Sequence, residues 1–365
     1  MQRRSFLKHA GLGAVATGAA VSTPAFAQDM PSLSWRLSSA FPAALDLRIG
    51  AGEHFCKFVS EATGGKFNIR HFPDGEIVPA SDLLEAVSTR KVECGHGSSR
   101  LFFAKNPAFC FDAAVPFGLN ARQMNAWMSE GEGLRLTREL FKPEKIINFP
   151  LGNTGAQMGG WYVKEIKRTG DLKDLKMQVG GLAGDVLSRL GVVPQQVDLA
   201  KLAEAFEKDG LQAVAGAGAY EDAKLGLNKV AKYYYAPGWW AGGEQLSLYI
   251  NDEVWNQLPK HYQAVVQSAA LAAHTTATAR YDALNPQALA QLTTNGAQVR
   301  AFPRSIMDAA FEASQQVYKD LGAKDPRFKA LHDSYMGFRD SEMPWFRLTE
   351  GAFGQYLGVA LSARS

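Results

Sequence analysis

The chain carries many side chains able to act as nucleophiles, bases or metal ligands, but none stands at a spacing typical of catalysis. It contains no HExxH pair, Walker lysine loop, GxSxG elbow or EF-hand loop. Ser98 and Ser99 follow Gly97 as in a nucleophile turn. No oriented histidine and aspartate partners are evident, so a polar loop is the better interpretation. The sequence therefore predicts that the protein is not an enzyme. The histidines beyond residue 27 also lack metal-ligand spacing: His54, His71, His96, His261, His274 and His332.

The sequence also lacks a clear motif for a bound cofactor or for a disulfide. Gly216-Ala217-Gly218 begins like a dinucleotide fingerprint, but Glu221 occupies the third glycine position, so we expect no cofactor there. The cysteines number three and form no CxxC pair, which favours buried, inert thiols. A bridge between Cys94 and Cys110 is left open, and the third cysteine is Cys56.

Polar and aromatic residues instead gather in three glycine-rich stretches, 152–161, 176–181 and 237–243. In α/β sheets, ligands bind at the carboxyl ends of strands, where glycine lets a ligand approach the backbone. The pattern therefore favours a small-molecule cleft. Core packing is the alternative for the two tryptophans. The residues that these stretches offer are Asn153, Gln157, Gln178, Trp239, Trp240 and Ala241.

Strand and helix periodicities alternate through the first two thirds of the chain, which predicts α/β units on a mostly parallel sheet. We expect strands at 33–37, 67–69, 92–96, 146–151, 157–163, 176–179, 211–215 and 232–235. A long helix is expected at 121–141. Beyond residue 252 helices dominate, at 252–258, 260–284 and 305–321, with an interruption expected before Pro286 and a strand at 298–302.

The first 27 residues read as a leader for export. Arg3-Arg4-Ser5-Phe6-Leu7-Lys8 is a twin-arginine pattern, and Ala25-Phe26-Ala27 supplies the small residues of a cleavage site. The apolar stretch 10–21 is shorter than the roughly 18–20 residues of a membrane span. We therefore expect cleavage after Ala27 and a periplasmic location. The leader's basic residues account for the whole net charge of +3, so nothing favours a nucleic-acid partner.

Several stretches together resemble one protein family. They are Gly152-Asn153-Thr154-Gly155 with Gly159-Gly160-Trp161, the run from Asp174 to Gly181, Gly191 to Gln196, and Tyr233 to Trp240. They resemble the periplasmic solute receptors of tripartite ATP-independent (TRAP) transporters, the DctP family, and are most similar to the branch that binds 2-oxo acids such as pyruvate. The similarity extends over essentially the whole chain.

The resemblance implies a two-lobed α/β periplasmic binding-protein fold with crossing strands, a long bracing helix and a helical C-terminal region. Lobe one would comprise 28–152 and about 241–275, and lobe two 153–240 and about 276–325. A helical segment, about 326–365, would follow. The expected partners are a small-molecule ligand and the membrane subunits of a permease. A homodimer through the C-terminal helices is also implied, with packing on the chain's own lobes as the alternative for their aromatics: Phe338, Trp345, Phe346, Phe353 and Tyr356.

The ligand positions of the resembling branch are altered here. Gln178 stands where an arginine grips the ligand carboxylate. Of the residues that hold a sodium ion, only Gln157 is kept, so we expect no metal. Arg100 stands where a ligand tyrosine is expected. The remaining sodium-site positions are Ala215, Gly216 and Ala241.

Three interpretations of this altered pocket stay open. The ligand is an organic acid held by Arg100 with help from Ser98 or Ser99; or it is a neutral or aromatic solute that fills the vacated space; or the protein is a sensor with a vestigial pocket. We take the first as the main prediction. The full set of expected ligand contacts is Ser99, Arg100, Asn153, Gln157, Gln178, Ala215, Gly216, Trp239, Trp240 and Ala241.

Overall fold

The computed structural model describes residues 30–197 and 201–363. The expected leader, 1–27, therefore lies outside the described residues. Within the described part, no helix combines the length and apolar character that crossing a membrane requires.

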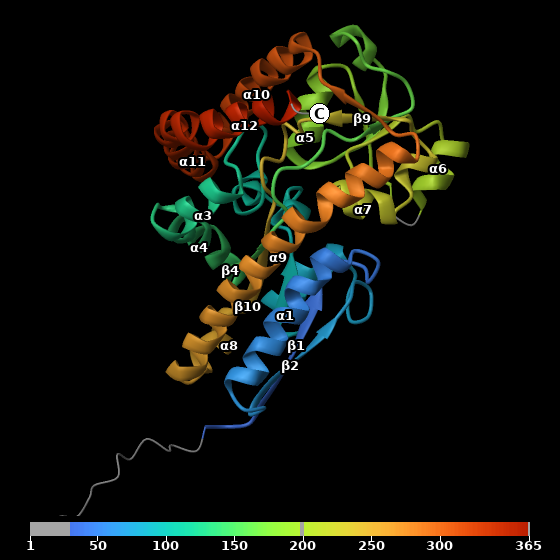
Figure 1. Cartoon of the computed structure of the whole chain (residues 1–365). Coiled ribbons are helices and arrows are strands. Elements are labelled where there is room, and N and C mark those ends of the chain that lie inside the picture. Colours follow the sequence, from blue (N-terminus) through green and yellow to red (C-terminus); the bar gives the residue numbers. More distant parts are fainter. Residues whose placement is uncertain (1–29, 198–200, 364–365) are drawn as a thin grey trace, which may run out of the picture.

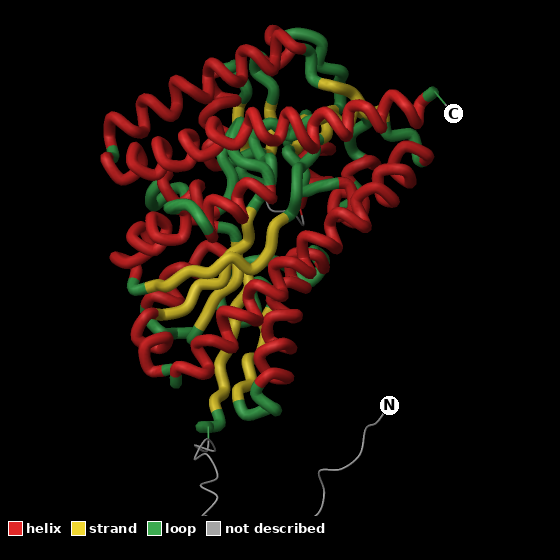
Figure 2. Tube along the Cα trace, turned by 60° about the vertical axis from the view of Figure 1, so that its left-hand side comes forward, coloured by secondary structure: helices red, strands yellow, loops and turns green. Residues whose placement is uncertain are grey.

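Two sheets form the centres of two lobes in the described part of the chain. The sheet of lobe one has the strand order β2-β1-β3-β10-β4, and only β10 runs antiparallel to its neighbours. The sheet of lobe two has the order β11-β9-β5-β8-β6-β7, with β5 antiparallel. The expected α/β fold with mostly parallel sheets is confirmed. Figure 2 shows the strands of lobe one running toward lobe two, with helices on both sides.

The strands have these bounds in lobe one: β1 Leu33–Ser39, β2 Phe67–Phe72, β3 Cys94–Gly97, β4 Ile146–Asn153 and β10 Gln245–Asn251. In lobe two they are β5 Trp161–Tyr162, β6 Lys176–Gln178, β7 Val193–Gln195, β8 Ala213–Val214, β9 Tyr233–Ala236 and β11 Gln298–Ala301. The strands expected at 157–163 and 211–215 are therefore only two residues long.

The helices around lobe one are α1 Asp46–Ala62, α2 Leu83–Ser88, α3 Ala121–Ser129, α4 Gly133–Phe141 and α8 Asp252–Gln257. Those of lobe two are α5 Gly181–Arg189, α6 Leu202–Lys208 and α7 Ala219–Lys224. The C-terminal region contains α9 Lys260–Thr294, α10 Arg304–Lys324, α11 Pro326–Phe346 and α12 Ala352–Ser362.

The single helix expected at 121–141 is wrong, because the chain breaks it into α3 and α4. Asn120 and Gln123 form a capping box that starts α3. The chain then turns back over the Trp127 ring, and a Cβ on Gly133 would lie only 2.7 Å from that ring. Glycine permits this close approach and weakens a continuous helix.

Helix α9 runs along both lobes (Figure 1). It packs on α1 and β4 in lobe one and on α7 in lobe two. The expected interruption before Pro286 is wrong, since the helix continues through this proline to Thr294. Proline removes one backbone hydrogen bond. Buried side chains on either side, Tyr281 and Ala288, hold the helix in place across it.

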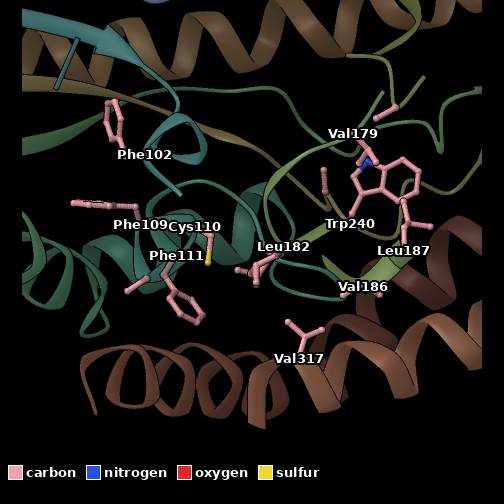
Figure 3. Close-up of a cluster of buried hydrophobic side chains, with 14 of the residues drawn as sticks. Phe102, Phe109, Cys110, Phe111, Val179, Leu182, Val186, Leu187, Trp240 and Val317 are labelled. Carbon is pink, nitrogen blue, oxygen red and sulfur yellow. The ribbon is translucent and has the colours of Figure 1, made fainter. Parts of the chain in front are cut away.

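One hydrophobic cluster continues from lobe one into lobe two. Phe109, Cys110 and Phe111, in the 3₁₀ segment Pro107–Asp112, belong to the same buried cluster as Leu182 and Val186 of α5 (Figure 3). The lobes are therefore in contact through apolar side chains, as in a closed conformation.

The three cysteines are free and buried, as expected. Burial raises the pKa of the Cys94 and Cys110 thiols well above the ordinary value, which keeps them protonated and unreactive. The bridge left open between these two residues is not formed.

A candidate ligand site between the two lobes

Two adjoining cavities lie between the lobes. The larger has a volume of about 210 Å³ and the smaller about 40 Å³. Side chains and backbone from both lobes line each of them. The residues that border both cavities are Arg48, Arg100, Val179, Ala215, Gly216 and Ala217.

Most of the residues predicted from the sequence border these cavities. They converge because β6 and β8 are parallel neighbours, so their carboxyl ends open at one edge of the sheet of lobe two. The loop between β9 and β10 passes the same edge. Gln157, Trp240 and Ala241 line the smaller cavity, and Gln178 lines the larger one. Three further predicted residues border both cavities: Arg100, Ala215 and Gly216.

Ser99, Asn153 and Trp239 do not border either cavity. The Ser99 hydroxyl donates to Asp112 inside lobe one. The Asn153 side chain accepts a hydrogen bond from the Gly155 backbone N–H at 2.9 Å. Trp239 stacks on Phe117 with ring centroids 5.3 Å apart. The Ser99 and Trp239 side chains are engaged within the fold, whereas the buried Nδ2 of Asn153 has no hydrogen-bond partner among the described residues. A role of these three residues in ligand binding stays a prediction.

A buried charge cluster that the sequence analysis missed joins the lobes beside the cavities. Arg48 of α1 donates from Nε to Glu221 of α7 and from Nη1 to Glu244, before β10, both at 3.1 Å. The Arg48 and Glu221 side chains are 5% and 0% exposed. Tyr281 of α9 donates to the other Glu221 oxygen at 3.0 Å. These residues are far apart in the sequence and form no local motif, so their proximity becomes evident only in the folded chain.

Glu244 is held as a charged carboxylate. Ser98 donates a 2.7 Å hydrogen bond to Oε1, and Arg100 Nε lies 3.4 Å from the same oxygen. Burial alone would raise the pKa of Glu244, but Arg100 and Arg48 outweigh it and lower the pKa to about 2. Glu244 therefore fixes the position of the Arg100 side chain in the cleft.

Arg100 reaches from lobe one across to lobe two. It lies in the 3₁₀ turn Ser99–Phe102, and a Cβ added to Gly181 of α5 would meet its Cγ at 3.3 Å. Its side chain is 48% exposed, and within residues 30–197 and 201–363 its single polar contact is with Glu244. A guanidinium has five donors, so most of them remain for a ligand.

Gln157 is part of the lining of the smaller cavity, and its side chain carries a buried acceptor without a partner. Its Nε2 donates to the Thr154 carbonyl at 3.2 Å, while Oε1 has no hydrogen-bond partner among the described residues. An unpaired buried polar atom costs about 1–3 kcal/mol. This oxygen lies beside Gly218, which is not part of the lining of either cavity.

The side chains of the cleft do not fit a metal site. Both nearby carboxylates, Glu221 and Glu244, are already bound by Arg48, and Gln157 Oε1 is a lone neutral oxygen. The described residues contain no group of three or more histidine, cysteine, aspartate or glutamate side chains placed to hold an ion. We therefore assign no step of ligand binding to a metal.

Known proteins of one family are similar to this chain over most of its length. The model of bacterial extracellular solute-binding proteins, family 7 (DctP), matches residues 39–325. A monocarboxylate 2-oxoacid-binding periplasmic protein of Nostoc sp. is 41% identical, over 98% of this chain and 99% of that protein.

Solved structures of TRAP transporter solute-binding proteins are also similar. One from Bordetella bronchiseptica is 45% identical, covers 92% of this chain and 100% of its own, and has a TM-score of 0.89; it is described as a dimer with calcium and picolinate in one site and the other site apo. One from Colwellia psychrerythraea, with calcium and pyruvate, is 30% identical, covers 89% and 99%, and has a TM-score of 0.86.

Proposed function

We propose that this chain, which belongs to the bacterial extracellular solute-binding proteins of family 7, captures a small organic acid between its lobes and delivers it to the membrane subunits of a TRAP-type permease. The observation that carries the acid assignment is Arg100, a cation in the cleft whose remaining donors have no partner among the described residues. A guanidinium pairs with a carboxylate through two charge-assisted bonds. The relatives' ligands, 2-oxoacids, pyruvate and picolinate, support an acid over a neutral solute.

A binding assay tests this function directly. Native mass spectrometry of the protein from its own host identifies the co-purified molecule, and calorimetry then compares picolinate and pyruvate with the neutral analogue picolinamide. We expect saturable binding of an acid without turnover, and a smaller radius of gyration in small-angle scattering. Equal affinity for acid and amide would refute the acid assignment, and consumption of the ligand would show an enzyme.

Ligand affinity should not depend on a metal ion. Among the described residues, the one carboxylate that lines the cavities, Glu244, is bound by Arg48 at one oxygen and by Ser98 and Arg100 at the other, so few oxygens remain to coordinate an ion. The dissociation constant is therefore expected to be equal in sodium and choline buffers, and unchanged when a calcium chelator replaces added calcium. The Bordetella relative, with its bound calcium, is the positive control for the assay. A sodium or calcium dependence would mean that backbone and ligand oxygens build a site.

We further propose that the mature chain works in the periplasm. The twin-arginine leader and the small residues up to Ala27 support export, as does the extracellular family. A fusion of the leader to a reporter protein should appear in the periplasm, and replacing Arg3 and Arg4 with lysine should retain the reporter inside the cell.

We propose that the protein forms a homodimer through its C-terminal helices. Helix α12 has no buried residue, so its aromatics do not pack on this chain's own lobes. Exposed apolar patches of this kind mark subunit contacts. Trp345, Leu348, Phe353, Tyr356 and Val359 are between 64% and 71% exposed.

Light scattering of the mature protein should therefore give the mass of a dimer. Phe353→Lys combined with Tyr356→Lys should convert it to a monomer that still binds ligand, because neither side chain is buried in the chain itself. Gln355→Lys on the same helix is the matched control and should remain a dimer. A monomeric mass for the unmodified protein would exclude this interface.

A further inference from the structure

The walls of the larger cavity are mostly apolar. The polar side chains among its recorded lining are Arg48, Ser98, Arg100 and Gln178, and the Ser98 hydroxyl is already bound to Glu244. An engineered apolar cavity of about 150 Å³ is large enough to bind benzene. The larger cavity, at about 210 Å³, therefore has room for a six-membered ring or a branched chain. Its apolar lining comes from lobe one through Phe41, Pro42, Leu45 and Leu101, and from lobe two through Leu202, Leu225 and Leu227.

The smaller cavity is also lined mainly by apolar residues, among them Cys110, Pro116 and Trp240, and differs from the larger one chiefly in size. Gln157 and Glu244 line it, together with Gly180 and Leu182 at the start of α5. Its volume of about 40 Å³ is enough for a group of a few atoms.

The boundary between the two cavities consists of small residues and two arginines. Apart from Arg48 and Arg100, it contains Val179, Ala215 and residues 216–217. Arg48 is already paired with two carboxylates, which leaves Arg100 as the cation with spare donors at this boundary. A molecule whose acid group contacts Arg100 therefore lies next to both cavities, of which the larger has room for an apolar tail.

We infer that the larger cavity is a subsite for an apolar tail, so that the receptor selects organic acids with an aromatic or branched aliphatic tail over acids of the size of pyruvate. The inference rests on the proposed function, because the acid group at Arg100 anchors the ligand. It adds the class of acid: one end polar and charged, the other apolar and of about the volume of a ring.

Calorimetry with a series of 2-oxo acids tests the subsite. Pyruvate, 4-methyl-2-oxopentanoate and phenylpyruvate share the acid group and differ in the tail. Each buried methylene contributes about 0.8 kcal/mol, so both longer acids are expected to bind at least tenfold more tightly than pyruvate.

Filling the cavity should remove this preference. Leu225→Trp, from lobe two, should weaken phenylpyruvate at least tenfold and change pyruvate affinity less than threefold. Leu101→Trp makes the same test from lobe one at a position 44% exposed, where the larger ring does not have to enter a core. Leu271→Trp on α9, 65% exposed and remote from the cavities, is the control and should change neither affinity.

The outcomes separate the two proposals. If pyruvate binds as tightly as the longer acids and neither cavity variant alters the series, the subsite is refuted while the acid receptor stands. If no acid in the series binds, and picolinate also fails, the proposed function falls and the subsite with it. Tight binding of the longer acids that is lost selectively in both variants supports the subsite.

Discussion

Arg48→Met is expected to lower the free energy of unfolding by about 3–5 kcal/mol, because breaking a buried ion pair leaves uncompensated buried charge. In this chain two carboxylates, Glu221 and Glu244, would lose the same cation. Methionine keeps most of the side-chain volume, so the loss would reflect charge more than packing. Urea denaturation followed by circular dichroism measures the shift of the midpoint.

The matched control is Arg304→Met. Arg304 is 93% exposed and contacts Asp308 one helical turn away at 3.4 Å, a pair of little consequence for stability. Adding Glu221→Gln to Arg48→Met should recover part of the loss, since one of the stranded carboxylates becomes neutral. An unfolding midpoint of Arg48→Met equal to that of the control would disprove a stabilising role for the cluster.

Arg100→Ala is expected to weaken binding of an acidic ligand at least tenfold. Hydrogen bonds to charged groups contribute about 1.5–3 kcal/mol, and 1.4 kcal/mol corresponds to a factor of ten. The fold should persist, because Glu244 keeps its contacts with Arg48 and Ser98. Calorimetry with the ligand identified from the host, or with picolinate, measures the change.

Arg100→Lys should recover only part of the affinity, since lysine cannot make the two-pronged contact with a carboxylate. Arg135→Ala is the matched control: this arginine is also about half exposed and pairs with glutamates, but it lies on α4 outside the cavity lining. Unchanged affinity in Arg100→Ala would favour a neutral ligand. Gln178→Arg then offers the converse test, a cation restored from lobe two.

Local pattern was enough to predict the α/β fold class and the glycine-rich stretches that bring Gln157, Gln178, Trp240 and Ala241 to the cavities, while Arg100, Ala215 and Gly216 were expected there from the family resemblance. Alternation marked the strands, and glycine-rich segments such as 152–161 and 237–243 marked the loops at their ends, where Gln157 and Trp240 lie. Where the helices break or continue depends on tertiary packing, which the local pattern does not contain. The turn over Trp127 divided one expected helix, and buried side chains on both sides of Pro286 kept another continuous.

The buried charge cluster around Arg48 could not be predicted from the sequence for a different reason. Arg48 is separated from Glu221 by 173 positions and from Glu244 by 196. Nothing in its own segment distinguishes Arg48 from a solvated residue on a helix. Ser99 and Trp239 stand in the expected loops, but neighbouring residues of a loop point in different directions. Their side chains contact Asp112 and Phe117 and do not line the cavities.

The apolar cluster that continues from lobe one into lobe two also has a thermal consequence. Separating the lobes would move Cys110 away from Leu182 and expose both to water. Hydration of apolar surface raises the heat capacity, so an open form has the larger heat capacity of the two. Apolar contacts weaken on cooling. For a chain whose lobes separate without ligand, we therefore expect low temperature to favour the open cleft.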